Sequence, residues 1–233
     1  MKALVYKEFK LAMHPVCYLF VALFPLMILV PDGGYPRAVG FIYVLSCYPI
    51  LFLGANKGQQ SNDLLFSTLL PVRKKDIVMA RIITVAVIQF AFMIISCCLL
   101  PLAFMIRDSI AAQAASDPKA LESITPIGLG IDAYPLILAA AIIGFSLADL
   151  IFFPIYYKNG KSIVMSTLLT ILGFIIYLGI TTILIPYIIG IEKVNSLPLL
   201  IQLSVLVASF VVYVPLHYLT YKISANLLEK VDF

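Results

Sequence analysis

Charged residues are scarce in this chain, and their scarcity excludes a soluble globular domain. Asp, Glu, Lys and Arg make up 12% of the 233 residues, whereas 62% are hydrophobic. Soluble domains carry about 25% charged residues. A chain of this length could bury one soluble core, but most of its surface would still have to be polar. The composition therefore predicts a membrane protein, most of which lies inside the membrane.

The usual motifs of catalysis and nucleotide binding are also missing. No GxSxG or HExxH motif occurs, which disfavours a hydrolase or a membrane protease. The nearest match to a phosphate-binding loop is NGKS at 159–162, but Ile155 stands where a Walker loop needs its first glycine. His14 and His217 are interpreted as interfacial or core residues, and the four cysteines lack metal-ligand spacing. We therefore expect no catalytic, cofactor or metal site in this chain.

Long apolar runs dominate what is present. A helix needs about 20 mostly apolar residues to cross the hydrocarbon core of a bilayer. Six runs approach or exceed this length: 14–30, 38–56, 82–106, 133–156, 163–189 and 198–220. Because they do not alternate between polar and apolar residues, they predict helices and not a β-barrel. Prolines interrupt most of them, and we expect the fifth span to tilt or break near Pro186.

Lysine and arginine are divided unequally between the predicted loops. If the N-terminus is cytoplasmic, twelve of them lie on the inner side: Lys2, Lys7, Lys10, Lys57, Arg73, Lys74, Lys75, Arg81, Lys158, Lys161, Lys222 and Lys230. The other four lie on the outer side: Arg37, Arg107, Lys119 and Lys193. The positive-inside rule then predicts that both termini are cytoplasmic. The net charge of +4 is explained by this asymmetry, so no nucleic-acid partner is expected.

The segment that precedes the first span, residues 1–13, is predicted to form a short amphipathic helix. Lys7 and Lys10 share one arc of its helical wheel, and apolar residues that include Phe9 occupy most of the other arc. Glu8 interrupts the apolar side. A basic amphipathic helix of this kind can lie in the plane of the headgroups. The alternative is a basic leader that only sets the topology; a cleavable signal peptide is not expected.

A basic, leucine-rich loop at 57–81 separates the second and third predicted spans. Asn62 or Ser61 can cap a short helix in it, DLLFSTLL, which Pro71 ends. Four apolar residues form one face of this helix: Leu65, Phe66, Leu69 and Leu70. Such a short helix needs a partner groove, which the rest of the small cytoplasmic part does not provide. The alternative, a basic loop on lipid headgroups, accounts for the charges but not for the leucine face.

One titratable residue, Asp149, lies well inside a predicted span. By helix rise it is about 10 Å from the cytoplasmic edge of that span at Tyr156. A carboxylate in hydrocarbon costs several kcal/mol unless it is paired, hydrated or protonated. It is interpreted either as part of a polar cavity on a substrate pathway, or as a carboxylate that snorkels or bonds to a neighbouring hydroxyl.

Three segments together resemble the permease subunits of ABC-2 type transporters: YKEFKL near the N-terminus, NDLLFSTLLPVRKKDIVMAR in the basic loop, and FFPIYYKNGKS after the fourth span. The resemblance extends to the six-span layout and is most specific at TLLPVRKKD, residues 68–76. It is nearest to the small bacterial permeases that export peptides, including the phenol-soluble modulin exporters.

This resemblance implies an all-α, ABC-2 (type V) exporter-like fold in one domain over 1–233. It implies an interfacial elbow helix at 1–13, a cytoplasmic coupling loop at 57–81 and an extracellular loop at 107–132. The residues that would couple to the ATPase are Asn62, Asp63, Leu65, Phe66, Thr68, Leu69, Pro71, Arg73, Lys74, Lys75 and Asp76. The residues of the interfacial elbow helix would be Lys7, Glu8 and Phe9, and Asp149 would line the substrate pathway.

The resemblance also implies partners and a location. Two copies of a separate cytoplasmic ATPase would bind ATP and Mg, because the tail YKISANLLEKVDF is too short for a fused ATPase. A second permease, either a copy of this chain or a relative, would complete the pathway in a bacterial plasma membrane. The cargo would be an amphipathic or antimicrobial peptide or another hydrophobic molecule.

Two other function classes stay open. One is an ion- or proton-coupled secondary transporter with Asp149 as the carrier site, although no convincing internal repeat supports an inverted-repeat carrier. The other is a non-transporting membrane protein, such as an immunity or scaffold subunit.

Overall fold

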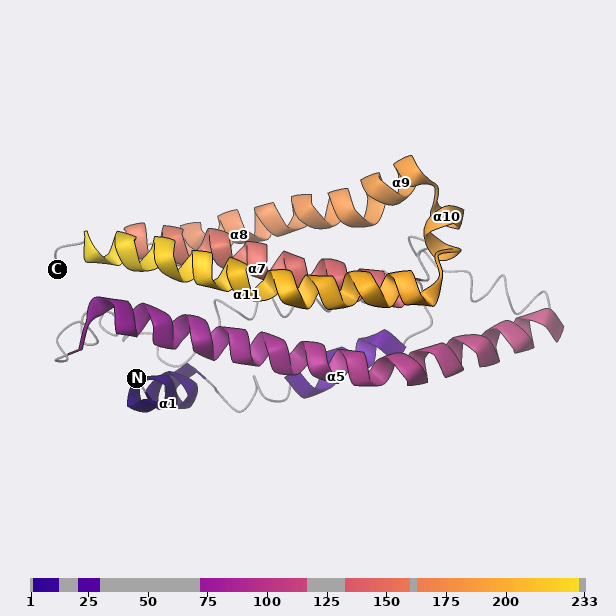
Figure 1. Cartoon of the computed structure of the whole chain (residues 1–233), viewed down its shortest axis with the longest axis horizontal. Helices are drawn as coiled ribbons and strands as arrows, with labels where there is room; N and C mark the ends of the chain where they lie inside the picture. The colour runs from indigo at the N-terminus through magenta and orange to yellow at the C-terminus, as the bar shows by residue number, and fades with distance from the viewer. Residues whose placement is uncertain (1, 13–20, 30–71, 117–132, 160–162, 231–233) are drawn as a thin grey trace.

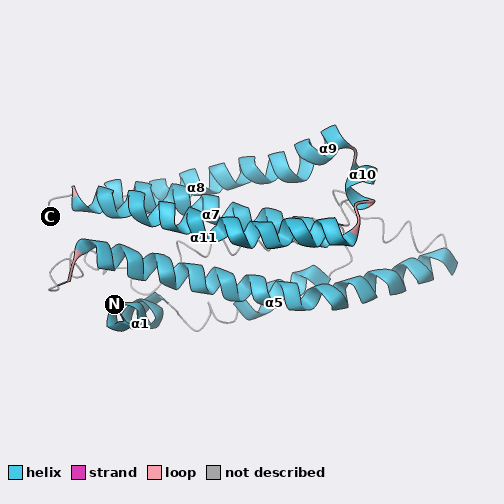
Figure 2. Cartoon of the chain, viewed as in Figure 1, coloured by secondary structure: helices cyan, strands magenta, loops and turns pink. Residues whose placement is uncertain are grey.

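The computed structural model describes residues 2–12, 21–29, 72–116, 133–159 and 163–230. Over these ranges the structure is helical and contains no strand (Figure 2). The elements in chain order are α1 (Lys2–Ala12), the 3-10 helix η1 (Phe24–Leu29), α5 (Lys74–Ser116), α7 (Tyr134–Asn159), α8 (Ile163–Leu178), the π-helix η2 (Gly179–Leu184), α9 (Ile185–Ile189), α10 (Ile191–Asn195) and α11 (Leu199–Glu229).

Four helical stretches among the described residues are long and apolar enough to cross a membrane. They are Lys74–Ile106, Tyr134–Lys158, Val164–Ile189 and Leu199–Glu229. These stretches correspond to the third to sixth predicted spans, so the all-helical, apolar character expected of a membrane protein is confirmed. The second predicted span, 38–56, lies outside the described residues, and so does much of the first, of which 21–29 are helical. The total of six spans stays a prediction.

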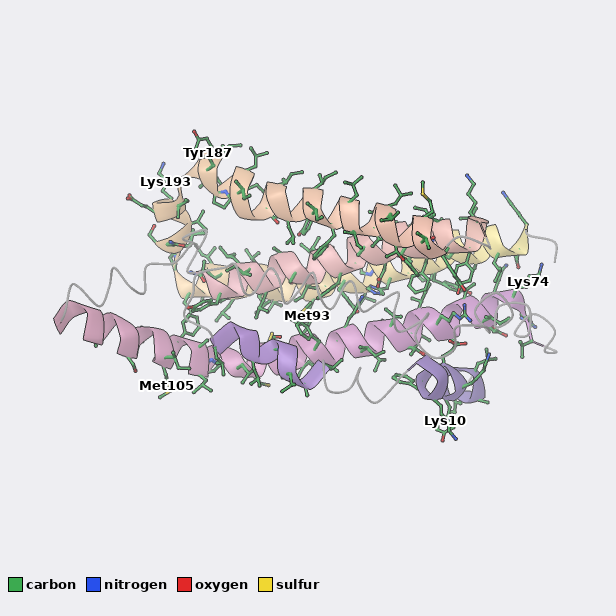
Figure 3. All side chains as sticks on the ribbon, turned by 180° about the vertical axis from the view of Figure 1, so that it is seen from behind. Lys10, Lys74, Met93, Met105, Tyr187 and Lys193 are labelled. Atoms are coloured by element: carbon green, nitrogen blue, oxygen red, sulfur yellow. The ribbon has the colours of Figure 1, made fainter. Side chains whose placement is uncertain are left out.

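The long helices run alongside one another, and α7 is the most enclosed of them (Figure 1). It packs against α8 and α11, and α5 packs equally against α11 and η1. The short helix α1 lies crosswise to the long helices and packs against the first turns of α5 (Figures 1 and 3). The predicted N-terminal helix is therefore confirmed as a helix, with an orientation that suits a position in the headgroup plane.

One end of the bundle, which we call the basic end, holds α1, the start of α5 and the ends of α7 and α11. Lys75 at the start of α5 pairs with Glu229 at the end of α11, with 3.1 Å between Nζ and Oε1. Lys10 and Lys74 lie at this end, and Tyr187 and Lys193 lie at the other (Figure 3). The gathering of basic residues at one end follows the prediction, and its orientation toward the cytoplasm stays a prediction.

Helix α5 is longer at both ends than the predicted span 82–106. It begins at Lys74, inside the predicted coupling loop, because Ile77 and Ala80 are buried against Leu4 of α1. It continues through Pro101 to Ser116, inside the predicted extracellular loop, where the Ala-rich sequence DSIAAQAAS favours a helix. Residues 74–81 and 107–116 are therefore helical, although the sequence places them in loops.

Near Pro186, where the sequence predicts a tilt or a break, the helix widens into a π turn, continues through Pro186 and ends at Gly190. Because proline has no backbone N–H to donate, the turn before it cannot keep the regular bonding pattern. The chain passes through η2 immediately before α9, whose first turn contains Pro186. Gly190 then ends α9 with a φ of 97°, a left-handed value that suits glycine, and α10 follows.

Two apolar clusters fill the interior of the bundle. The central cluster includes Phe92, Met93, Phe145, Ala148, Leu206 and Tyr213. The basic-end cluster includes Val78, Ile82, Val85, Phe152, Phe153, Tyr157, Ala225 and Leu228. Met93 of α5, labelled in Figure 3, belongs to the central cluster between α5 and the other long helices. Along each of α5, α7 and α11 the two clusters are separated by a short interval, and polar side chains occupy that interval.

Candidate functional site

Four polar groups from three helices meet where the two apolar clusters adjoin, and the ring of one of them, Tyr213, belongs to the central cluster. Gln89 comes from α5, Asp149 from α7, and Tyr213 and His217 from successive turns of α11. All four are buried; Asp149 is 1% exposed and His217 is 7% exposed. Asp149 therefore does not snorkel to the surface, and within the described part of the chain its partners are an amide and an imidazole and not a hydroxyl.

The four side chains form a closed ring of hydrogen bonds, which we call the polar ring. Gln89 Nε2 donates to Asp149 Oδ1 at 3.2 Å, and Asp149 Oδ2 lies 2.8 Å from His217 Nε2. The Tyr213 hydroxyl lies 2.9 Å from Gln89 Oε1 and 3.1 Å from the carbonyl oxygen of Ala86. His217 Nδ1 lies 3.0 Å from the Tyr213 carbonyl oxygen, which closes the ring.

The position of each proton in this ring follows from its partner. A backbone carbonyl only accepts, so His217 Nδ1 carries a proton and donates it to Tyr213. The contact between Asp149 and His217 Nε2 then contains one proton, which is on either the acid or the ring. Both forms of the pair have no net charge, and this removes much of the cost of burying a carboxyl group in hydrocarbon.

A second polar group, which we call the elbow clamp, lies at the basic end. Glu8 of α1 and Arg81 of α5 form an ion pair with 3.3 Å between Oε2 and Nε. Arg81 Nη1 donates to the hydroxyl of Tyr156 on α7 at 3.1 Å, and the guanidinium lies 6.0 Å from the centre of that ring. Glu8 is 3% exposed and Arg81 is 2% exposed. The clamp therefore joins α1, α5 and α7.

The elbow clamp accounts for the charge that interrupts the apolar side of the N-terminal helix. Leu4 and Glu8, one turn apart, both face α5 and are buried. Phe9 packs against Ile88 of α5, and Lys7 Nζ lies 3.9 Å from Glu8 Oε1. Glu8 therefore lies on the packed face of α1, where it forms the ion pair with Arg81.

Most of the predicted coupling residues, Asn62 to Pro71, lie outside the described residues. The remaining four, Arg73, Lys74, Lys75 and Asp76, form the turn that leads into α5 and its first residues. Asp76 lies in the first turn, where a negative charge suits the helix dipole. The structure places these residues at the basic end with the elbow clamp, and Asp149 lies deeper in the bundle.

Sequence reasoning missed Gln89, Arg81 and His217 as partners of the predicted residues. His217 was interpreted as an interfacial or core residue, whereas it is the buried partner of Asp149. A signal was present, because Tyr213 and His217 are four residues apart and so share one helix face. A buried acid also requires a partner at similar depth, and His217 is one of the few polar residues of the last span.

The described residues contain no cluster of three His, Cys, Asp or Glu side chains that could hold a metal ion. Comparison of the chain with protein-family models, with curated proteins and with solved structures found no match. The resemblance to ABC-2 permeases therefore rests on the sequence segments alone.

Proposed function

We propose that this chain is the permease subunit of an ATP-driven exporter of the ABC-2 type. It would work in a bacterial plasma membrane with two copies of a cytoplasmic ATPase, which bind ATP and Mg, and with a second permease. Its cargo would be amphipathic peptides or other hydrophobic molecules. Four apolar helices in one bundle and the TLLPVRKKD run at 68–76 support this proposal.

The elbow clamp is the observation that carries the proposal. An ATPase that acts on a membrane subunit must pass its movement through a small contact into the transmembrane helices. Residues 62–76, which carry the coupling resemblance, run directly into α5, and the first turns of α5 are joined to α1 and α7 through Arg81. A displacement of the segment before α5 would therefore move three helices together.

The test is co-purification from native membranes, with mass spectrometry of every bound chain. We expect an ATPase to be recovered with the wild-type chain. The double change Leu65→Asp, Phe66→Asp should abolish its recovery, since burying each large apolar side chain contributes about 1.5–3 kcal/mol to such a contact. Ser67→Asp is the matched control, because it adds a carboxylate to the same predicted helix away from the leucine face.

Two outcomes would contradict the proposal. One is the absence of any ATPase among the chains bound to the wild type. The other is normal ATPase binding by the double variant, which would leave the basic loop as a segment that lies on lipid. Neutralising Arg73, Lys74 and Lys75 should weaken ATPase recovery mainly as the salt concentration rises, because exposed charges contribute little individually.

A second candidate, a proton-coupled secondary transporter, is favoured by the polar ring. A buried acid and a buried imidazole that share a proton are the groups from which membrane proton relays are built. The two candidates differ in their energy source. Transport by the chain alone in proteoliposomes, driven by a pH gradient without ATP, would favour the carrier over the permease subunit.

A further inference from the structure

We propose that Asp149 and His217 form a proton-binding latch inside the bundle, which joins α7 to α11 in one protonation state and releases them in the two adjacent states. The ligand of this site is the proton, exchanged with water. The proposal does not depend on the exporter function, because every group that it uses belongs to the polar ring of this chain.

The bonds of the polar ring are all satisfied only when one proton lies between Asp149 and His217. Gln89 donates to one carboxyl oxygen, and His217 uses its Nδ1 proton on the Tyr213 carbonyl. The remaining contact joins Asp149 Oδ2 to His217 Nε2 at 2.8 Å and needs one donor and one acceptor. A single proton supplies this arrangement, whether it is on the oxygen or on the nitrogen.

Loss of the shared proton places two acceptors opposite each other. The carboxylate of Asp149 would then face the lone pair of His217 Nε2. Moving the remaining ring proton from Nδ1 to Nε2 does not help, because Nδ1 would then face the Tyr213 carbonyl as a second acceptor. The pair would also carry a net negative charge, and the contact between α7 and α11 would repel.

Gain of a second proton by the pair also breaks the contact, because it adds a donor where an acceptor is needed. Asp149 would be neutral and His217 would be a cation. The acid could then accept from Nε2–H only by carrying its own proton on Oδ1, to which Gln89 Nε2 already donates. The pair would then have a net positive charge. We therefore infer that the latch closes over a window of pH and opens on both sides of it.

Among the residues that the structure describes, no charged side chain faces the pair to compensate such a charge. On α5 the nearest described charged residue is Arg81, eight residues before Gln89 and about 12 Å away by helix rise, and it is already paired with Glu8. On α11 the polar ring adds Tyr213, a titratable phenol, and Lys222 lies on the exposed surface. On α7 the nearest titratable residue toward the basic end is Tyr156. Helix α8 packs on α7, and the only titratable residue in Ile163–Leu178 is Tyr177, whose hydroxyl donates to the Ala140 carbonyl.

The two apolar clusters enclose the ring from both sides. Phe145 and Ala148 belong to the central cluster, and Phe152 and Phe153 belong to the basic-end cluster, so Asp149 lies between them on α7. Little water can compensate a charge in such surroundings, and an electrostatic mismatch there is much more costly than at a surface. The separation of α7 and α11 is the response that relieves it.

The test measures the distance between α7 and α11 as a function of pH in the full-length protein in lipid nanodiscs. Spin labels are attached through Lys158→Cys and Lys222→Cys, two exposed positions on these helices, after replacement of the native cysteines. The wild-type ring should give the shortest mean distance at intermediate pH and longer distances at both extremes.

Asp149→Asn is the decisive variant. The asparagine amide copies the protonated acid, because it can donate to His217 Nε2 and accept from Gln89, but it has no proton to lose. The lengthening at alkaline pH should therefore disappear, while the lengthening at acid pH should remain, because His217 still gains a proton. Asp149→Leu should lose the dependence on pH at both extremes and keep the longer distance throughout.

Ser146→Ala is the matched control, one turn earlier on α7. Its hydroxyl is buried and, among the described residues, donates to the carbonyl of Ile142 in its own helix, so its removal should leave both pH responses intact. The proposal is overturned if the wild-type distance is constant over the pH range in which the protein stays folded. It is equally overturned if Asp149→Asn retains the alkaline response, because another group, such as Tyr213, would then be the one that titrates.

Discussion

The carboxylate of Glu8 lies 3.3 Å from the guanidinium Nε of Arg81, and both side chains are almost completely removed from solvent. A buried ion pair is weak evidence for stability, because desolvation offsets much of the attraction. Its geometry, however, is demanding, since either charge left alone would be costly. The pair therefore fixes the position of α1 against α5 more firmly than the apolar contacts of Leu4 would do alone.

Removing the acid from this pair should be strongly destabilising. Glu8→Ala removes the carboxylate that faces the buried Arg81 guanidinium, at an expected cost of about 3–5 kcal/mol in the free energy of unfolding. The double variant Glu8→Ala, Arg81→Met should recover most of that loss. The measurement is unfolding of the full chain by SDS in mixed micelles.

The exposed pair between Lys75 and Glu229 is the control for that experiment. Both side chains are 47% exposed, so Lys75→Ala should change the free energy of unfolding by about 0–1 kcal/mol. Equal losses for Glu8→Ala and Lys75→Ala would show that the burial of the elbow clamp has no energetic consequence.

The orientation of the bundle can be measured by labelling single cysteines from outside intact cells. In a background without the native cysteines, Lys193→Cys should react with a membrane-impermeant maleimide, because it is exposed at the end opposite the basic end. Lys10→Cys and Lys230→Cys should react only after lysis. External labelling of Lys10→Cys would reverse the orientation, and the assignment of the coupling loop would fail with it.

Close packing between α7 and α8 should make Gly144 intolerant of a larger side chain. A Cβ at this position would lie 2.7 Å from Cε2 of Phe174 and 3.0 Å from Cε1 of Tyr177. We expect Gly144→Ala to cost about 1–3 kcal/mol by overpacking. Gly179→Ala is the control, because its Cβ would meet no atom within 4 Å. Equal thermal stability of the two variants would contradict this packing.

Loss of one hydroxyl from the polar ring should have a smaller but measurable effect. Tyr213→Phe removes the hydroxyl that donates to Gln89 Oε1, at an expected cost of about 0.6–2 kcal/mol for a hydrogen bond between helices in a membrane. Tyr187→Phe removes a hydroxyl from a side chain that is 82% exposed and should cost nothing. Both variants are compared by SDS unfolding, and identical curves would show that the bond makes no net contribution.

The spans that the structure describes were predictable because their signal is local. About 20 apolar residues in succession indicate a membrane helix whatever the helix contacts. Pro186 indicates the altered turn at η2 in the same way, since a proline acts on the backbone bonds of its own turn. The start of α5 was missed because Ile77 and Ala80 are held in the helix by Leu4, a contact with a distant segment.

The polar ring was only half predictable. The cost of burying Asp149 follows from the sequence, but the identity of its partner depends on which helix packs beside α7. His217 is 68 residues away. The sequence does not determine which of the later helices packs against α7. The buried hydroxyl groups do not identify the partner of Asp149 either, because those of Thr84, Ser96 and Thr170 donate to backbone carbonyls of their own helices.

The separation of Asp149 and His217 along the chain also sets an order of events during biosynthesis. The ribosome completes α7 well before α11, so the carboxyl group of Asp149 reaches the membrane while its imidazole partner has not yet been made. Until then the acid must stay protonated or remain in contact with water. Insertion of the last helix is therefore the step that lets the nascent bundle close around its own polar interior.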